Sequence, residues 1–173
     1  MRLFVALKPE GAFLSALSEL QVRLRRAGVT GRYLDAENLH MTLAFIGEWP
    51  EDVTDLLPEV KTPFLIELSH IGIFPSAEVL CAGVRPSEGL NNTVRRLRHV
   101  LADAGVPFDR KAFTPHITLV RGVNVPAKAD ISAILVPPAV MTVNSISLFR
   151  SDRGKNGMVY TEIGRSLELG VRS

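Results

Sequence analysis

Two short stretches carry the same pattern, His-x-Thr-Leu, inside apolar runs of strand length: NLHMTLAFIG at residues 38–47 and FTPHITLVRG at residues 113–122. In a β-strand, positions i and i+2 point to the same face, so each histidine shares a face with the threonine that follows it. His40 and His116 are 116 − 40 = 76 residues apart. This weak internal repeat predicts two similar lobes, related by an approximate two-fold axis, that bring four polar groups to one cleft.

The rest of the chain predicts an α+β protein. Apolar residues that recur every three or four positions indicate amphipathic helices at 10–27 and 87–104, each followed by a glycine. A brief helix is expected within 52–60, and residues 123–138 are Pro-rich and mainly loop. The fold class is two antiparallel sheets with helices on their outer faces, as a single bilobal domain over 1–173 with motifs at 40–42 and 116–118. Strands are expected at 2–7, 32–34, 39–47, 64–74, 78–84, 115–122, 141–151 and 158–169.

Composition excludes several classes of protein. The 20 Lys and Arg residues barely outnumber the 18 Asp and Glu residues, so overall charge does not argue for a polyanion partner. The single cysteine, Cys81, rules out an intramolecular disulfide framework and Cys-based zinc sites, and it fits a reducing compartment. The first apolar run is too short for a signal peptide, and the run at 131–143 is interrupted by two prolines. We expect a cytoplasmic protein without membrane association.

The residue types of the repeated motif suit phosphoryl chemistry. Histidine titrates near pH 6.5, so one ring of a pair can accept a proton while the other donates one. The hydroxyls of Thr42 and Thr118 can hold an oxyanion without adding charge. In-line attack at phosphorus needs a base, an acid on the opposite side and donors to the oxygens between them. Two facing His-x-Thr strands supply all three.

A second pair of residues occupies the fifth position after each histidine: Phe45 in the first copy and Arg121 in the second. An arginine can hold a phosphate through two parallel hydrogen bonds, and a phenylalanine can stack on a nucleobase. Simple alternation places both on the face opposite the histidines. A role in the cleft therefore requires a bulge, a strand end or strong twist.

The remaining polar residues are less specific to one chemistry. Zinc is disfavoured because threonine is a poor ligand and no H-x-H or H-x-x-x-H occurs. His70 lies in an apolar strand and is expected to be buried and structural, whereas His99 lies among arginines on a helix and is expected to be exposed. Tyr160 and Arg150 fall on the last strands, and the sequence does not place them relative to the cleft.

The motifs resemble those of the RNA 2′,3′-cyclic phosphodiesterases, also called 2′-5′ RNA ligases, of the two-histidine phosphoesterase superfamily. The matching segments are RLFVAL, ENLHMTLAFIGE, IGIFPS and FTPHITLVR, spread from end to end of the chain. The resemblance implies opening of a 2′,3′-cyclic phosphate at an RNA end to a 2′-phosphate, without a metal or other cofactor. It further implies these roles: His116 as base, His40 as acid, Thr42, Thr118 and Arg121 on the phosphate, and Phe45 on the nucleoside.

Several alternatives remain open at this level. The roles of base and acid can exchange between the two histidines, because a symmetric site can carry out the reaction in either direction. The activity could instead be 2′-5′ ligation, hydrolysis of 2′-5′ linkages or of small cyclic nucleotides, or non-catalytic binding of RNA ends. The expected partner is RNA with a cyclic phosphate end, such as tRNA halves, or a small cyclic nucleotide, and the expected state is a monomer. Val120 departs from the family pattern, in which alanine commonly precedes the arginine.

Overall fold

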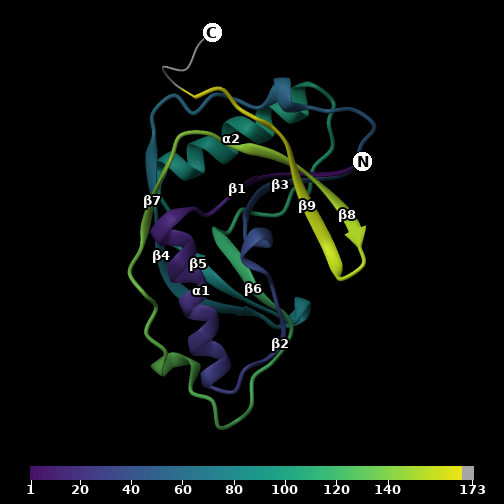
Figure 1. Cartoon of the computed structure of the whole chain (residues 1–173). Helices are drawn as coiled ribbons and strands as arrows, with labels where there is room; N and C mark the ends of the chain where they lie inside the picture. The colour runs from purple at the N-terminus through teal and green to yellow at the C-terminus, as the bar shows by residue number, and fades with distance from the viewer. Residues whose placement is uncertain (169–173) are drawn as a thin grey trace.

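The chain forms two antiparallel β-sheets and two long α-helices (Figure 1), so the predicted α+β class is confirmed. The computed structural model describes residues 1–168 of the 173. The helices are α1 (Gly11–Arg26) and α2 (Glu88–Asp103). The strands are β1 (Arg2–Leu7), β2 (Thr30–Tyr33), β3 (Met41–Glu48), β4 (Phe64–Phe74), β5 (Val79–Val84), β6 (His116–Asn124), β7 (Val140–Val143), β8 (Ser147–Gly154) and β9 (Gly157–Arg165).

The two sheets follow one plan. The four-stranded sheet has the order β3-β1-β8-β9, and the five-stranded sheet has the order β2-β6-β5-β4-β7. If β2 is set aside, each sheet begins with a motif strand, β3 or β6, and continues with the strand that precedes the helix of the same half, β1 or β5. The strand order therefore places β3 and β6 at corresponding positions of the two sheets.

The two helices are exchanged between the sheets. Helix α1 belongs to the half with the first motif but packs on the five-stranded sheet, where the Gln21 amide donates to the carbonyl oxygens of Leu34 (2.9 Å) and of Leu119 in β6 (3.1 Å). Helix α2 belongs to the second half and contacts β3 as well as β4. Helix α1 therefore packs on the sheet of the other half, α2 contacts strands of both sheets, and residues of both halves form one continuous hydrophobic core.

Two predicted elements differ from the structure. The helix expected within 52–60 is a single 3-10 turn, Thr54–Leu56, because the Asp52 carboxylate accepts from the Thr54 backbone N–H (2.8 Å) and fixes a tight turn ahead of Pro58. The strand expected at 141–151 is divided into β7 and β8, which belong to different sheets. Residues 144–146 carry the chain from one sheet to the other.

The C-terminal strand and His70 also differ from their predictions. The strand expected at 158–169 ends at Arg165, and residue 169 lies outside the described residues. The prediction that His70 is buried is wrong: its side chain is exposed. It pairs across the sheet with Gly83, and its ring covers that glycine so closely that a Cβ there would lie 2.2 Å from a ring atom. Within residues 1–168, no helix is both long and apolar enough to cross a membrane.

Candidate active site

Both motif strands contain an irregularity at the same place. In β3, Ala44 pairs with Val5 and Thr42 pairs with Ala6, so Leu43 falls between two register positions. In β6 the register skips Leu119 in the same way, between Thr118 and Val120. Such a bulge resets the alternation of side chains by one residue. As a result, Phe45 lies on the same face as Thr42, and Arg121 lies on the same face as Thr118.

The two histidines are held by the same backbone contact. Nδ1 of His40 lies 2.7 Å from the carbonyl oxygen of Asn38, and Nδ1 of His116 lies 2.6 Å from the carbonyl oxygen of Thr114. A carbonyl can only accept, so Nδ1 carries the proton and donates in each case. This fixes the tautomer and leaves Nε2 of each ring to accept or deliver a proton.

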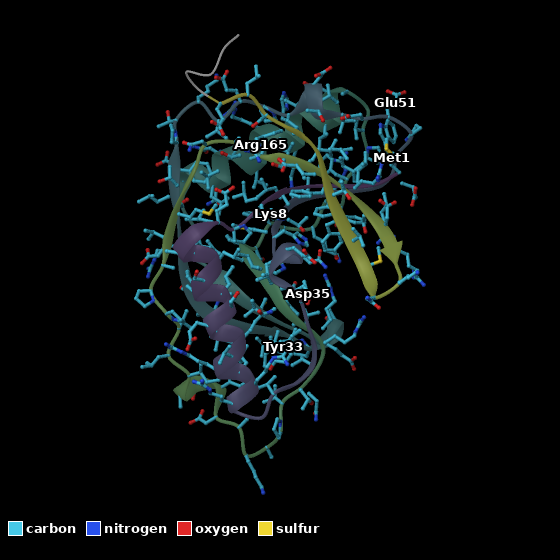
Figure 2. The ribbon with its side chains drawn as sticks, viewed as in Figure 1. Met1, Lys8, Tyr33, Asp35, Glu51 and Arg165 are labelled. Carbon is cyan, nitrogen blue, oxygen red and sulfur yellow. The ribbon has the colours of Figure 1, made fainter. Side chains whose placement is uncertain are left out.

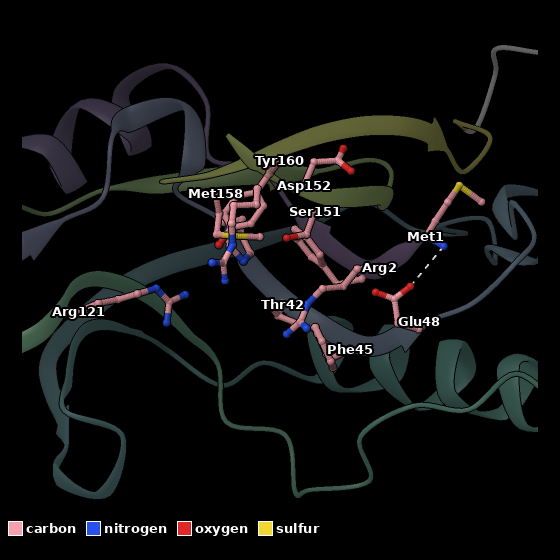
Figure 3. Close-up of a pocket in the computed structure, with 13 residues that line it drawn as sticks. Met1, Arg2, Thr42, Phe45, Glu48, Arg121, Ser151, Asp152, Met158 and Tyr160 are labelled. Atoms are coloured by element: carbon pink, nitrogen blue, oxygen red, sulfur yellow. Dashed lines mark ion pairs between the residues drawn. The ribbon is translucent and has the colours of Figure 1, made fainter. Parts of the chain in front are cut away.

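One cavity of about 560 Å³ is lined by all six residues singled out from the sequence: His40, Thr42, Phe45, His116, Thr118 and Arg121. A second cavity of about 700 Å³ continues from it over Phe45 toward Arg2 and Ser151. In Figure 3, Thr42 and Phe45 lie together while Arg121 approaches from a separate strand. The structure thus brings the six side chains to one site, and their chemical roles stay predictions.

Aromatic rings pack against both imidazoles, two of them against His40 and one against His116. The His40 ring centroid lies 4.8 Å from that of Phe4 and 5.0 Å from that of Tyr160, which meets it edge to face. His116 contacts Phe74, with centroids 5.1 Å apart. Burial lowers the pKa of His40 to about 4; the hydrogen bond to Asn38 opposes this, and the nearby charge of Arg121 adds to it. His40 is therefore neutral in the free protein at pH 7.

We expect NMR titration of the histidine ring protons to show the lowered pKa of His40 directly. His40 should keep its neutral-form shifts down to about pH 4, because desolvation disfavours the imidazolium. Tyr160→Ala removes a ring that shields His40 from water, so the pKa of His40 should rise toward 6.5 in that variant. His99, which is exposed on α2, is the internal control, and its ring-proton signals should be the same in the two proteins. A His40 midpoint near 6.5 in the wild type would contradict this account.

Several residues of the site were not identified from the sequence. Tyr160 lines the cavity over Phe45, whereas Arg150 is held outside it by an ion pair with Asp152 (2.8 Å). Phe4 and Phe74 lie in the segments RLFVAL and IGIFPS, whose only signal was their resemblance to family segments. Within residues 1–168, no three His, Cys, Asp or Glu side chains are grouped as metal ligands.

Comparison with known proteins gives a consistent result. The sequence profile of the 2′-5′ RNA ligase superfamily matches residues 13–155. The RNA 2′,3′-cyclic phosphodiesterase of Thermotoga maritima is 28% identical over 172 residues, covering 92% of this chain and 91% of that protein. The RNA 2′,3′-cyclic phosphodiesterase of Aquifex aeolicus is 30% identical, covering 88% and 92%. The crystal structure of E. coli LigT complexed with 3′-AMP superposes with a TM-score of 0.77 at 26% identity, covering 98% of each chain.

Proposed function

Because this chain belongs to the 2′-5′ RNA ligase superfamily, we propose that it is an RNA 2′,3′-cyclic phosphodiesterase that hydrolyses cyclic phosphate ends to 2′-phosphomonoesters without a metal. Relatives at about 30% identity over most of the chain bear that enzyme name. One observation carries the mechanistic part of the proposal: two imidazoles, each with Nδ1 bound to a backbone carbonyl, line the same cavity as two threonines and an arginine.

The proposed reaction needs one proton transfer at each histidine. Nε2 of His116 removes a proton from water as the water oxygen attacks phosphorus. The bond from phosphorus to the 3′ oxygen breaks, and Nε2 of His40 delivers a proton to that oxygen. The products are a 2′-phosphate and a 3′-hydroxyl, and solvent then restores the two rings. His40 is neutral in the free protein, so its acid form arises when the phosphodiester anion binds beside the ring and favours its charged state.

The other residues of the cavity hold the substrate in this scheme. The hydroxyls of Thr42 and Thr118 donate to the two non-bridging oxygens, where negative charge grows during attack. Arg121 balances the charge of the phosphate through its guanidinium group. Phe45 contacts the terminal nucleoside, because its ring lines both the cavity with the histidines and the cavity beside it.

The decisive experiment is incubation of the protein with a short RNA that ends in a 2′,3′-cyclic phosphate, in excess EDTA. We expect full turnover and a 2′-phosphate as the sole product, identified by ³¹P NMR and by its resistance to a 3′-specific phosphatase. Activity that is lost in EDTA and restored by zinc would overturn the metal-free mechanism. A 3′-phosphate product would reverse the assignment of the leaving oxygen, and tight binding without turnover would favour an RNA-end binding protein.

A further inference from the structure

A third cavity, of about 840 Å³, lies beyond Arg121 on the side away from Phe45. Arg121 lines this cavity and both of the others, so it stands where the three meet. One wall is β2 with the residues that follow it, and the opposite wall is the turn between β8 and β9. In Figure 2, Lys8, Asp35 and Tyr33 follow one another between α1 and the β8–β9 hairpin. We call this cavity the β2–hairpin groove.

The walls of the β2–hairpin groove carry cations from three separate parts of the chain: Lys8 after β1, Arg32 in β2 and Lys155 in the hairpin turn. Lys8 Nζ donates to the carbonyl oxygen of Glu37 (3.1 Å), but none of the three forms a salt bridge with any residue of the described range 1–168. The groove also contains the carboxylates of Asp35 and Glu37. With Arg121 included, the balance is 4 − 2 = +2, a local excess as large as that of the whole chain.

The cavity on the opposite side of Arg121 has a different character. Its lining includes the rings of Phe4 and Phe45, and Arg2 already lies over the Phe45 ring, 5.1 Å from its centroid. Its two carboxylates are engaged, Glu48 with the N-terminal amine and Asp152 with Arg150. Aromatic faces suit a nucleobase, whereas converging cations outside ion pairs suit phosphates. Cations also line the cavity over Phe45, but Arg2 there already contacts a ring, whereas Arg32 and Lys155 stand on opposite walls of the groove outside any ion pair of the described residues. This contrast favours a nucleoside on the side of Phe45 and phosphates in the groove.

The hairpin is built to overhang the groove. Pairing between β1 and β8 begins at Ser151, so residues 152–159 extend beyond the sheet with only each other as strand partners. One described bond ties this outer part to the first motif: the Asn38 side-chain amide donates to the carbonyl oxygen of Met158 (3.2 Å). A free two-stranded ribbon is marginally stable by itself, so contacts with a bound strand would add to its order.

From these observations we propose that the β2–hairpin groove binds the sugar-phosphate backbone of the RNA upstream of the cyclic phosphate, with Arg32 and Lys155 contacting successive phosphates from opposite walls. The inference rests on the proposed function, and it makes an RNA strand, rather than a cyclic mononucleotide, the preferred substrate. Contacts to phosphate carry no sequence information, so this subsite distinguishes substrates by the length of the strand and not by its sequence.

The test compares kcat/KM for an oligonucleotide and for a mononucleotide, both ending in the same 2′,3′-cyclic phosphate. Wild type should prefer the oligonucleotide, and in Arg32→Ala/Lys155→Ala the ratio of the two values should fall by about tenfold, as expected for loss of charge-assisted hydrogen bonds. The matched control Lys61→Ala/Lys128→Ala removes two exposed lysines elsewhere and should keep the wild-type ratio. Arg153→Ala tests the alternative path, because Arg153 lies on the same hairpin but lines the cavity over Phe45.

A binding measurement separates this inference from the proposed function. Fluorescence anisotropy with the product, an oligonucleotide ending in a 2′-phosphate, does not require turnover. If each cation contacts one phosphate, the slope of log Kd against log salt concentration should decrease by roughly 1.4 in Arg32→Ala/Lys155→Ala. A wild-type slope and ratio in that variant, or losses confined to Arg153→Ala, would overturn the groove assignment. A wild type that binds the strand through these cations but hydrolyses neither substrate would overturn only the proposed function.

Discussion

Replacing either His40 or His116 by alanine should lower kcat on a cyclic phosphate RNA end by about 10² to 10⁴-fold, the range for loss of a general acid or base. The reason is geometric. Each ring is held through Nδ1, so Nε2 is the atom left to exchange protons, and no other histidine lines the cavity of about 560 Å³ within residues 1–168. The measurement is single-turnover hydrolysis at saturating enzyme, which reports chemistry rather than substrate capture.

His99→Ala is the matched control for the two histidine variants. His99 is exposed on α2, where it faces Asp103 at 3.2 Å, and its loss should leave kcat unchanged. His40→Asn and His116→Asn add a further distinction, because asparagine can hydrogen-bond to a phosphate but cannot exchange protons near neutral pH. Asparagine variants that turn over at the wild-type rate would show that the histidines only recognise phosphate.

The second large effect is expected from the threonines. Thr42→Val and Thr118→Val keep the shape of a β-branched strand residue but remove the hydroxyl donor. Each should reduce kcat by roughly 10² to 10³-fold, as measured for loss of one preorganised oxyanion donor. The loss should appear in kcat more than in KM, because the donors act on charge that grows in the transition state.

Two further variants define what the threonine result means. Thr42→Ser and Thr118→Ser retain a hydroxyl and should stay within a few-fold of wild type if the donor is what matters. Thr142→Val changes an exposed threonine of β7 and should not alter kcat, which controls for the substitution itself. Wild-type kcat in both active-site valine variants would refute a donor role for these hydroxyls.

The repeated motif made much of the site predictable. A period of two places His40 with Thr42, and repetition of the frame at His116 indicates that the two pairs meet; the structure brings them to one cavity. The position of Phe45 and Arg121 was conditional on a bulge, and the structure contains one in each strand. The apolar doublets after each threonine, Leu-Ala and Leu-Val, are the sequence trace of those bulges, since two consecutive residues are buried in both.

The features that the sequence did not predict depend on which strands and side chains pack against one another in the fold. Val143 and Ile146 are both buried, so the apolar pattern continues across the point where the chain passes from β7 to β8 and to another sheet. The flanking apolar residues of His70 predicted burial, but its ring lies on an exposed face over Gly83. Tyr160 contacts His40 although β9 and β3 are opposite edges of their sheet, and the ring of Phe4 in β1 contacts both side chains, an arrangement that depends on the strand order.

The exchange of helices between the sheets has a consequence for how the cleft moves. Helix α1 packs on the sheet of the second motif, and α2 contacts β3 of the first motif. The two lobes are therefore linked to each other through both helices. Because α2 contacts strands of both sheets and one continuous core contains residues of both, widening the gap between β3 and β6 would disturb that shared core. Hinge closure, with its few flexible residues, is therefore a poor description of this protein. The separation of the two imidazoles is set during folding, before any substrate arrives.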